Sequence, residues 1–132
     1  MPKHSTEIST TARYAELPGL MRHLGQQASL LGISATAIPR LHLILEELFS
    51  NSIEHGYGQE CAQPVSISLQ THGSGVTLIY RDQAAPFDIN QRSVRTPDEE
   101  SLGGFGINLV LGMADAVRCR WEAGSNITEV DL

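Results

Sequence analysis

Hydrophobic residues recur at helical spacing over residues 38–53, which is the strongest pattern along the chain. At about 100° per residue, five of them and Ser52 fall on one side of the predicted helix: Ile38, Leu41, Leu45, Leu48, Phe49 and Ser52. Pro39 suits the first turn of this helix, and Gly56 and Gly58 are typical stop signals beyond it. The pattern therefore predicts an amphipathic helix with one side buried in the core.

A second face of the same helix carries an acid, an amide and an imidazole. Glu47, Asn51 and His55 lie within an arc of roughly 80° on that face. Glu46 lies about 100° further round and does not share their line. Polar helix faces are usually solvated surface, so this pattern alone does not establish a site.

The other hydrophobic patterns predict two further helices and two hairpins. The expected elements are a weak strand at 6–11, an amphipathic helix at 17–32, strands at 65–69 and 76–80, a helix at 107–114, and strands at 116–122 and 128–132 around a turn at 123–126. Strands that come as hairpins build antiparallel sheets. We therefore expect an α+β fold, a two-layer α/β sandwich with a mainly antiparallel mixed sheet and the helices on one face.

Composition narrows the class of protein further. The 132 residues, 41% of them hydrophobic, suit a single domain spanning residues 1–132. The formal net charge of −6 argues against direct nucleic-acid binding. Neither an apolar signal region nor a membrane-length apolar run is present, and the two cysteines form no Cys-x-x-Cys pair. We therefore expect a cytoplasmic protein without membrane contact.

Two more stretches carry candidate chemistry. Asp82 comes directly after the strand at 76–80, in the sequence RDQAAPFD. The glycine cluster at 103–106 opens the third predicted helix, where backbone N–H groups and the helix dipole suit phosphate. No Lys-Ser/Thr follows this cluster, so it is not a Walker loop, and no strand directly precedes it, as a Rossmann fingerprint requires.

Taken together and in this order, the three stretches resemble the Bergerat-fold (histidine-kinase-like, GHKL) ATPase domain. Within it they resemble the anti-sigma-factor serine/threonine kinases of bacterial partner-switching systems. EELFSNSIEHGYG is similar to the N box of that family, and RDQAAPFD to its first glycine box. GGFGINLVLGMADAV and GSNITEVDL are similar to the second glycine box and the closing hairpin. The resemblance covers nearly the whole chain and implies a protein kinase that uses ATP and Mg²⁺.

The resemblance also implies a role for individual residues. Glu47 would take the proton from a substrate hydroxyl, which suits phosphoryl transfer. Asn51 would coordinate Mg²⁺ through its side-chain oxygen, and Asp82 would accept a hydrogen bond from the adenine amino group. The remaining residues that it places around ATP are His55, Ala84, Gly103, Gly104, Phe105, Gly106 and Thr128.

One position departs from the pattern of this family. Its Asp-x-Gly reads Asp82-Gln83-Ala84 here, and a Cβ excludes conformations and close approaches that glycine permits. If the backbone at Ala84 needs a positive φ, or if the nucleotide base must approach it very closely, we expect weakened ATP binding. The following Pro86-Phe87-Asp88 fits the anti-sigma branch of the family.

The resemblance implies partners as well as an activity. An anti-sigma-factor antagonist protein would be the phosphorylated substrate, a sigma factor would be sequestered, and the kinase would form a homodimer. The alternative is a non-catalytic, nucleotide-gated adaptor that binds a sigma factor, an antagonist or a response regulator. Ala84 favours the adaptor, whereas Glu47 and Asn51 favour the kinase. A histidine-kinase catalytic domain is a weaker third alternative.

Overall fold

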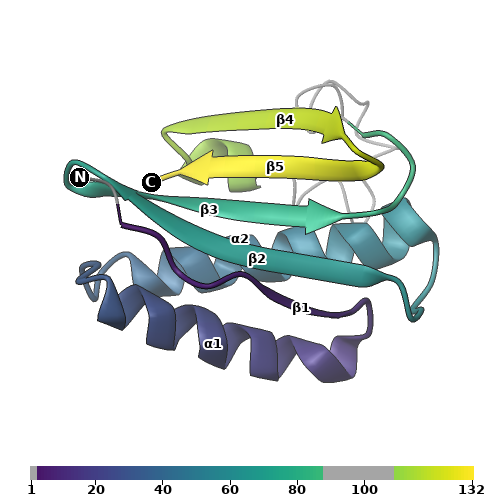
Figure 1. Cartoon of the computed structure of the whole chain (residues 1–132), viewed down its shortest axis with the longest axis horizontal. Coiled ribbons are helices and arrows are strands. Elements are labelled where there is room, and N and C mark those ends of the chain that lie inside the picture. Colours follow the sequence, from purple (N-terminus) through teal and green to yellow (C-terminus); the bar gives the residue numbers. More distant parts are fainter. Residues whose placement is uncertain (1–2, 88–108) are drawn as a thin grey trace.

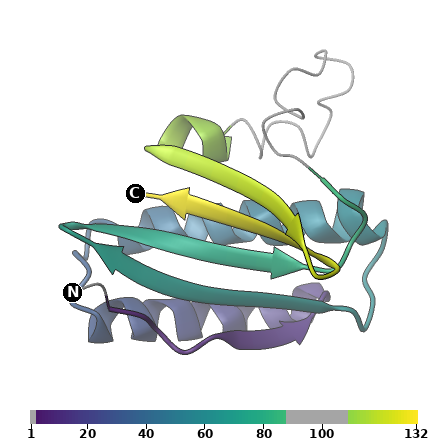
Figure 2. The ribbon, with the colours of Figure 1, turned by 45° about the horizontal axis from the view of Figure 1, so that its top comes forward.

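A five-stranded sheet with two long helices on one face forms the body of the molecule (Figures 1 and 2). The computed structural model describes residues 3–87 and 109–132. Its strands are β1 (Ile8–Thr11), β2 (Pro64–His72), β3 (Gly75–Asp82), β4 (Ala116–Glu122) and β5 (Ser125–Asp131). They lie in the order β1-β2-β3-β5-β4, and each pairing between these described strands is antiparallel. The expected two-layer α+β fold is confirmed.

The helices begin and end close to where the hydrophobic pattern predicts. They are α1 (Leu17–Leu30), preceded by the single 3₁₀ turn η1 (Tyr14–Glu16), and α2 (Ile38–Asn51). Helix α2 continues as the π-helical segment η2 (Ser52–Tyr57), which ends at Gly58 with a left-handed φ of 85°. Gly58, and not Gly56, is therefore the glycine that ends the helix. Among the described residues, no helix has the length and hydrophobicity that crossing a bilayer requires.

The core lies between the two helices and the inner face of the sheet. Helix α2 contributes Leu41, Ile44, Leu45 and Phe49, each with no exposed surface. Alternate residues of the central strands meet them, including Val65, Ile67, Leu69, Leu78, Tyr80 and Val130. Each such aliphatic or aromatic side chain contributes roughly 1.5–3 kcal/mol by its burial. This packing fixes α2 against the inner face of the sheet.

The last hairpin differs from its prediction at the turn. Only Ala123 and Gly124 connect β4 to β5, and both have a positive φ, of 52° and 81°. A two-residue turn with two positive φ angles is the type I′ geometry that matches the twist of a hairpin. The expectation of a turn over 123–126 was therefore wrong at its second half. Asn126 belongs to β5 and lies directly opposite Asp82 of β3.

Candidate functional site

A small cavity of about 150 Å³ lies where α2 and η2 meet the ends of β3 and β5. Four of the site residues expected from the sequence line it: Asn51, His55, Asp82 and Ala84. Its other lining residues are Gly56, Ala85, Pro86, Phe87 and Asn126. The helix and the strand end that were singled out separately in the sequence thus meet at one place.

Asn51 brings an unsatisfied oxygen to this cavity. The residue is only 8% exposed, and its Oδ1 atom has no hydrogen-bond partner among the described residues. A buried polar atom without a partner costs about 1–3 kcal/mol, so its persistence points to a ligand. A neutral amide oxygen is a suitable ligand for Mg²⁺, which prefers oxygen donors and shares its coordination with phosphates and water. Within residues 3–87 and 109–132, no group of three or more His, Cys, Asp or Glu side chains could hold a metal.

A chain of buried hydroxyl groups holds one oxygen of the Asp82 carboxylate. The Ser52 hydroxyl donates to Asp82 Oδ2 over 2.6 Å, and it lies 2.7 Å from the Tyr80 hydroxyl. Because the single proton of Ser52 goes to the carboxylate, Tyr80 must be the donor in the second bond. Burial raises the pKa of Tyr80 well above its ordinary value, which keeps this hydroxyl protonated.

Asn126 holds the other carboxylate oxygen. Its amide nitrogen donates to Asp82 Oδ1 over 2.9 Å, and also to the backbone oxygens of Ala84 and Ala85 at 3.2 and 2.9 Å. Its amide oxygen accepts from the backbone N–H of Phe87 at 2.9 Å. Asp82 is consequently oriented on both oxygens before any ligand is bound.

Ala84 takes the place of the expected glycine without backbone strain. Among the described residues other than glycine, only Ala123 has a positive φ. The backbone N–H of Ala84 donates to Asp82 Oδ1 over 3.2 Å, and the residue is 5% exposed. The positive φ that would have made alanine unsuitable is thus absent.

Of the remaining expected residues, the two that the structure describes, Glu47 and Thr128, are not among those that line the cavity. Glu47 is half-buried on α2, and burial together with the charges of Glu46 and Glu54 raises its pKa. Thr128 is buried in β5 opposite Tyr80, two residues beyond Asn126. The cluster Gly103, Gly104, Phe105 and Gly106 lies outside the described residues.

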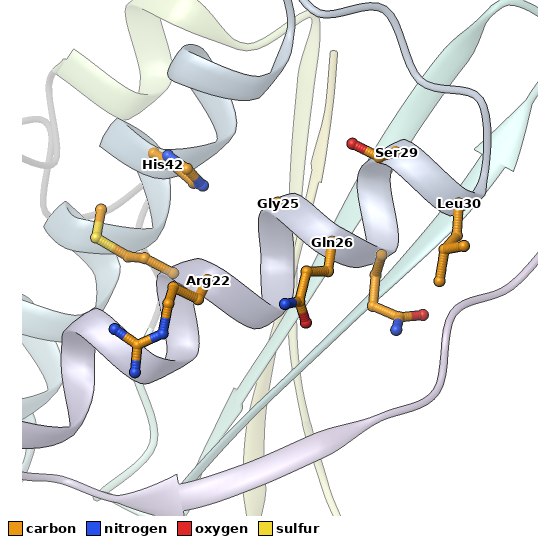
Figure 3. Close-up of a pocket in the computed structure, with 8 residues that line it drawn as sticks. Arg22, Gly25, Gln26, Ser29, Leu30 and His42 are labelled. Atoms are coloured by element: carbon orange, nitrogen blue, oxygen red, sulfur yellow. The ribbon is translucent and has the colours of Figure 1, made fainter.

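A larger hollow of about 790 Å³ follows the outer side of α1, and Figure 3 shows it. Arg22 and Leu30 lie at opposite ends of the labelled part of the helix, and His42 faces it from α2. No site residue expected from the sequence lines this hollow. We assign the candidate site to the smaller cavity because it gathers the buried carboxylate and the unsatisfied amide oxygen.

Comparison with known proteins shows the family to which this fold belongs. The model of the histidine kinase-like ATPase domain matches residues 10–132. The chain belongs to this family, as its helix motif, its aspartate and its glycine cluster led us to expect.

Similar curated proteins come from the serine kinase branch. The chain is 27% identical over 122 residues to the serine-protein kinase RsbW of Bacillus licheniformis, covering 86% of this chain and 76% of that protein. It is 26% identical over 137 residues to the serine-protein kinase RsbW of Bacillus velezensis, covering 91% and 86% respectively. These relatives bear out the expected branch of the family.

A solved structure shows the same fold. The crystal structure of the RsbU and RsbW domains of Rv1364c from Mycobacterium tuberculosis aligns with 99% of this chain, with a TM-score of 0.59 and 16% sequence identity. The chain spans 32% of the length of that structure.

Proposed function

We propose that this chain is an anti-sigma regulatory factor that acts as an ATP- and Mg²⁺-dependent serine/threonine protein kinase. Its substrate is an anti-sigma-factor antagonist protein of a partner-switching system. The observation that carries the proposal is the cavity that joins the unsatisfied oxygen of Asn51 to the doubly oriented carboxylate of Asp82. The family and the kinases named among the relatives support it.

Two side chains of the cavity recognise different parts of the ATP–Mg²⁺ complex. Asp82 accepts a hydrogen bond from the adenine amino group, and Asn51 binds Mg²⁺ through Oδ1. A Mg²⁺ ion held there would supply positive charge to neutralise the phosphates. His55, at the rim of the cavity, contacts a phosphate. The glycine cluster at 103–106 wraps the phosphates, and Thr128 supports the base from β5.

Glu47 accepts the proton in the transfer step. The serine hydroxyl oxygen of the antagonist forms a bond to the γ-phosphorus, the bond from that phosphorus to the β,γ-bridging oxygen breaks, and ADP leaves. The hydroxyl proton passes to the carboxylate of Glu47. A raised pKa makes this carboxylate a stronger base than an ordinary glutamate, which favours its role.

The proposal includes the partners and the setting of the kinase. The unphosphorylated antagonist competes for the kinase, and phosphorylation releases it, so that the kinase is free to sequester a sigma factor. We place this exchange in the cytoplasm and assign the kinase a homodimeric state. Size-exclusion chromatography with light scattering tests the dimer separately from the activity.

Calorimetry of ATP binding with and without Mg²⁺ is the experiment that tests the site. We expect micromolar-range binding that depends on Mg²⁺ and is lost in Asn51→Ala. Phosphorylation of the antagonist by the wild type, but not by Glu47→Ala, then tests the activity. Absence of binding at millimolar ATP would contradict the kinase and favour the adaptor. Ala84 needs no positive φ, which supports the kinase, and the calorimetry tests whether its β-carbon obstructs the nucleotide base.

A further inference from the structure

Side chains from elsewhere in the chain hold the segment 83–87, which follows Asp82 and which we call the base loop. The hydroxyl of Tyr57 accepts from the N–H of Gln83 over 2.7 Å. Asp82 accepts a hydrogen bond from the N–H of Ala84. The amide of Asn126 donates to the carbonyl oxygens of Ala84 and Ala85 and accepts from the N–H of Phe87. Pro86 has no N–H to satisfy. Three backbone N–H groups of the base loop, those of Gln83, Ala84 and Phe87, therefore have a side-chain acceptor.

The two side chains that reach the base loop come from opposite sides of the site. Tyr57 belongs to η2, and its hydroxyl also donates to the backbone oxygen of Pro64 over 2.8 Å. Burial raises the pKa of Tyr57 to about 12, so this donor stays protonated at neutral pH. Asn126 belongs to β5, and only 5% of it is exposed.

Asparagine has the chemistry that the position of Asn126 demands. Its nitrogen meets three acceptors, namely a carboxylate oxygen and two carbonyl oxygens, whereas its oxygen meets a donor. An aspartate would place a second carboxylate beside Asp82, and an alanine would remove the hydrogen bonds that the Asn126 amide makes to these groups. Ser52 holds the second carboxylate oxygen, so the two side chains together fix the carboxylate plane.

We propose that Asn126 is a positioning residue for base recognition. It orients Asp82 and the base loop before the nucleotide arrives, and through Asp82 it sets the preference for a purine with a 6-amino group. The inference rests on the proposed function, because it assumes that Asp82 reads the adenine. A preformed acceptor loses less freedom on binding, which favours the nucleotide that matches it.

The test compares ATP with inosine triphosphate, which carries an oxygen where ATP carries the amino group. Calorimetry in the presence of Mg²⁺ gives both affinities for the wild type, for Asn126→Ala and for Asn126→Asp. A hydrogen bond to a charged group is worth roughly a tenfold or larger change in affinity. We expect ATP affinity to fall about tenfold in both variants, and inosine triphosphate affinity to change less than about threefold.

Thr77→Val is the matched control. Thr77 is 6% exposed on the neighbouring strand, and its hydroxyl donates to the Asp131 carboxylate over 2.6 Å, at the other end of the same strand pair. This variant also loses a buried bond to a carboxylate, but away from the cavity. We expect it to lower stability and to leave the ratio of the two affinities unchanged.

The outcomes separate the inference from the proposed function. If folded Asn126→Ala and Asn126→Asp kept the wild-type ratio of ATP affinity to inosine triphosphate affinity, the role of Asn126 would be overturned. The proposed kinase activity would be unaffected by that result. Failure of the wild type to bind ATP would overturn both. If neither variant folds, Asn126→Gln keeps the amide one methylene further out. A lowered ratio there supports the inference, and an unchanged ratio overturns it.

Discussion

Ala84 and Gly56 form a complementary pair across the cavity. A β-carbon placed on Gly56 would lie 3.0 Å from the β-carbon of Ala84 and 3.8 Å from Asp82 Oδ2. The alanine that replaces the expected glycine in the base loop thus packs against a glycine in η2. The absence of a side chain at position 56 makes room for the methyl group at position 84.

We expect Gly56→Ala to lower the free energy of unfolding by about 1–3 kcal/mol, the usual cost of overpacking. Ala84 can move little because its N–H and C=O are both hydrogen-bonded. The double variant Gly56→Ala/Ala84→Gly should recover most of that loss. Urea unfolding measures both effects.

Gly112→Ala is the control for this pair, because a β-carbon there would meet nothing within 4 Å. It should be neutral or slightly stabilising. A Gly56→Ala protein as stable as the wild type, or a double variant weaker than the single one, would contradict the pairing.

Truncation of the neighbouring residues Asn51 and Ser52 should have different effects on the stability of the protein. Asn51→Ala removes an oxygen without a hydrogen-bond partner, so we expect the free energy of unfolding to change by less than about 1 kcal/mol while Mg²⁺-dependent ATP binding is lost. Ser52→Ala breaks the bonds to Asp82 and Tyr80, and should cost about 1–3 kcal/mol. Parallel urea titrations and calorimetry measure the two quantities. Equal destabilisation by the two variants would argue against a ligand role for Asn51.

The hydrophobic pattern was sufficient to predict the two long helices and the strand end at Asp82, whereas the common location of the helix motif and the aspartate was implied by the resemblance to the family. A helix fixes the angular relation between its residues, so Asn51 and His55 were expected on one face, and both line the cavity. Asp82 was expected at a strand end and is found there. These positions depend only on residues close together in the sequence, so the spacing of hydrophobic residues is enough to predict them.

The residues that hold Asp82 could not be identified in the same way. Ser52 falls within the apolar stripe, and nothing in a sequence distinguishes a buried serine that merely packs from one that binds a carboxylate. Asn126 was assigned to a four-residue turn, whereas the turn consists of Ala123 and Gly124 alone, and alanine rarely adopts the positive φ that Ala123 has. Recognising a two-residue turn there would have started the last strand at Ser125 instead of Thr128 and placed Asn126 opposite Asp82.

At the end of the β3–β5 pair away from the cavity, Asp131 should make the free energy of unfolding depend on pH in acid. Hydrogen bonds from Arg118, and then from Thr77, lower the pKa of Asp131 from 3.8 to about 2. A lowered pKa in the folded state contributes stability above pH 3.8, which is lost as the pH falls towards about 2. Because the ion pair is partly exposed, we expect about 1 kcal/mol.

Asp131→Asn removes the titrating group of this pair and is the variant to compare. Urea unfolding at about pH 5 and about pH 2 should show a larger loss of stability in the wild type than in Asp131→Asn, by about 1 kcal/mol. Equal losses in the two proteins would show that the Arg118–Asp131 pair adds nothing to stability.

The rate of phosphoryl transfer should rise with pH through the raised pKa of Glu47. Burial is the largest cause of that shift, and the charge of Glu46 is the next. Because a general base acts in its deprotonated form, the acid limb of the pH–rate profile should have its midpoint above 4.5, the ordinary value for glutamate.

The neighbouring acid makes this prediction specific to Glu47. Glu46→Gln keeps the general base but removes one of the charges that raise its pKa, so the midpoint should move to lower pH while transfer continues. Glu47→Gln should abolish transfer and retain ATP binding. Single-turnover rates at saturating ATP, measured on the acid side of neutrality, give the midpoint. A midpoint that Glu46→Gln leaves in place, or a Glu47→Gln protein with the normal rate, would assign the proton transfer to another group.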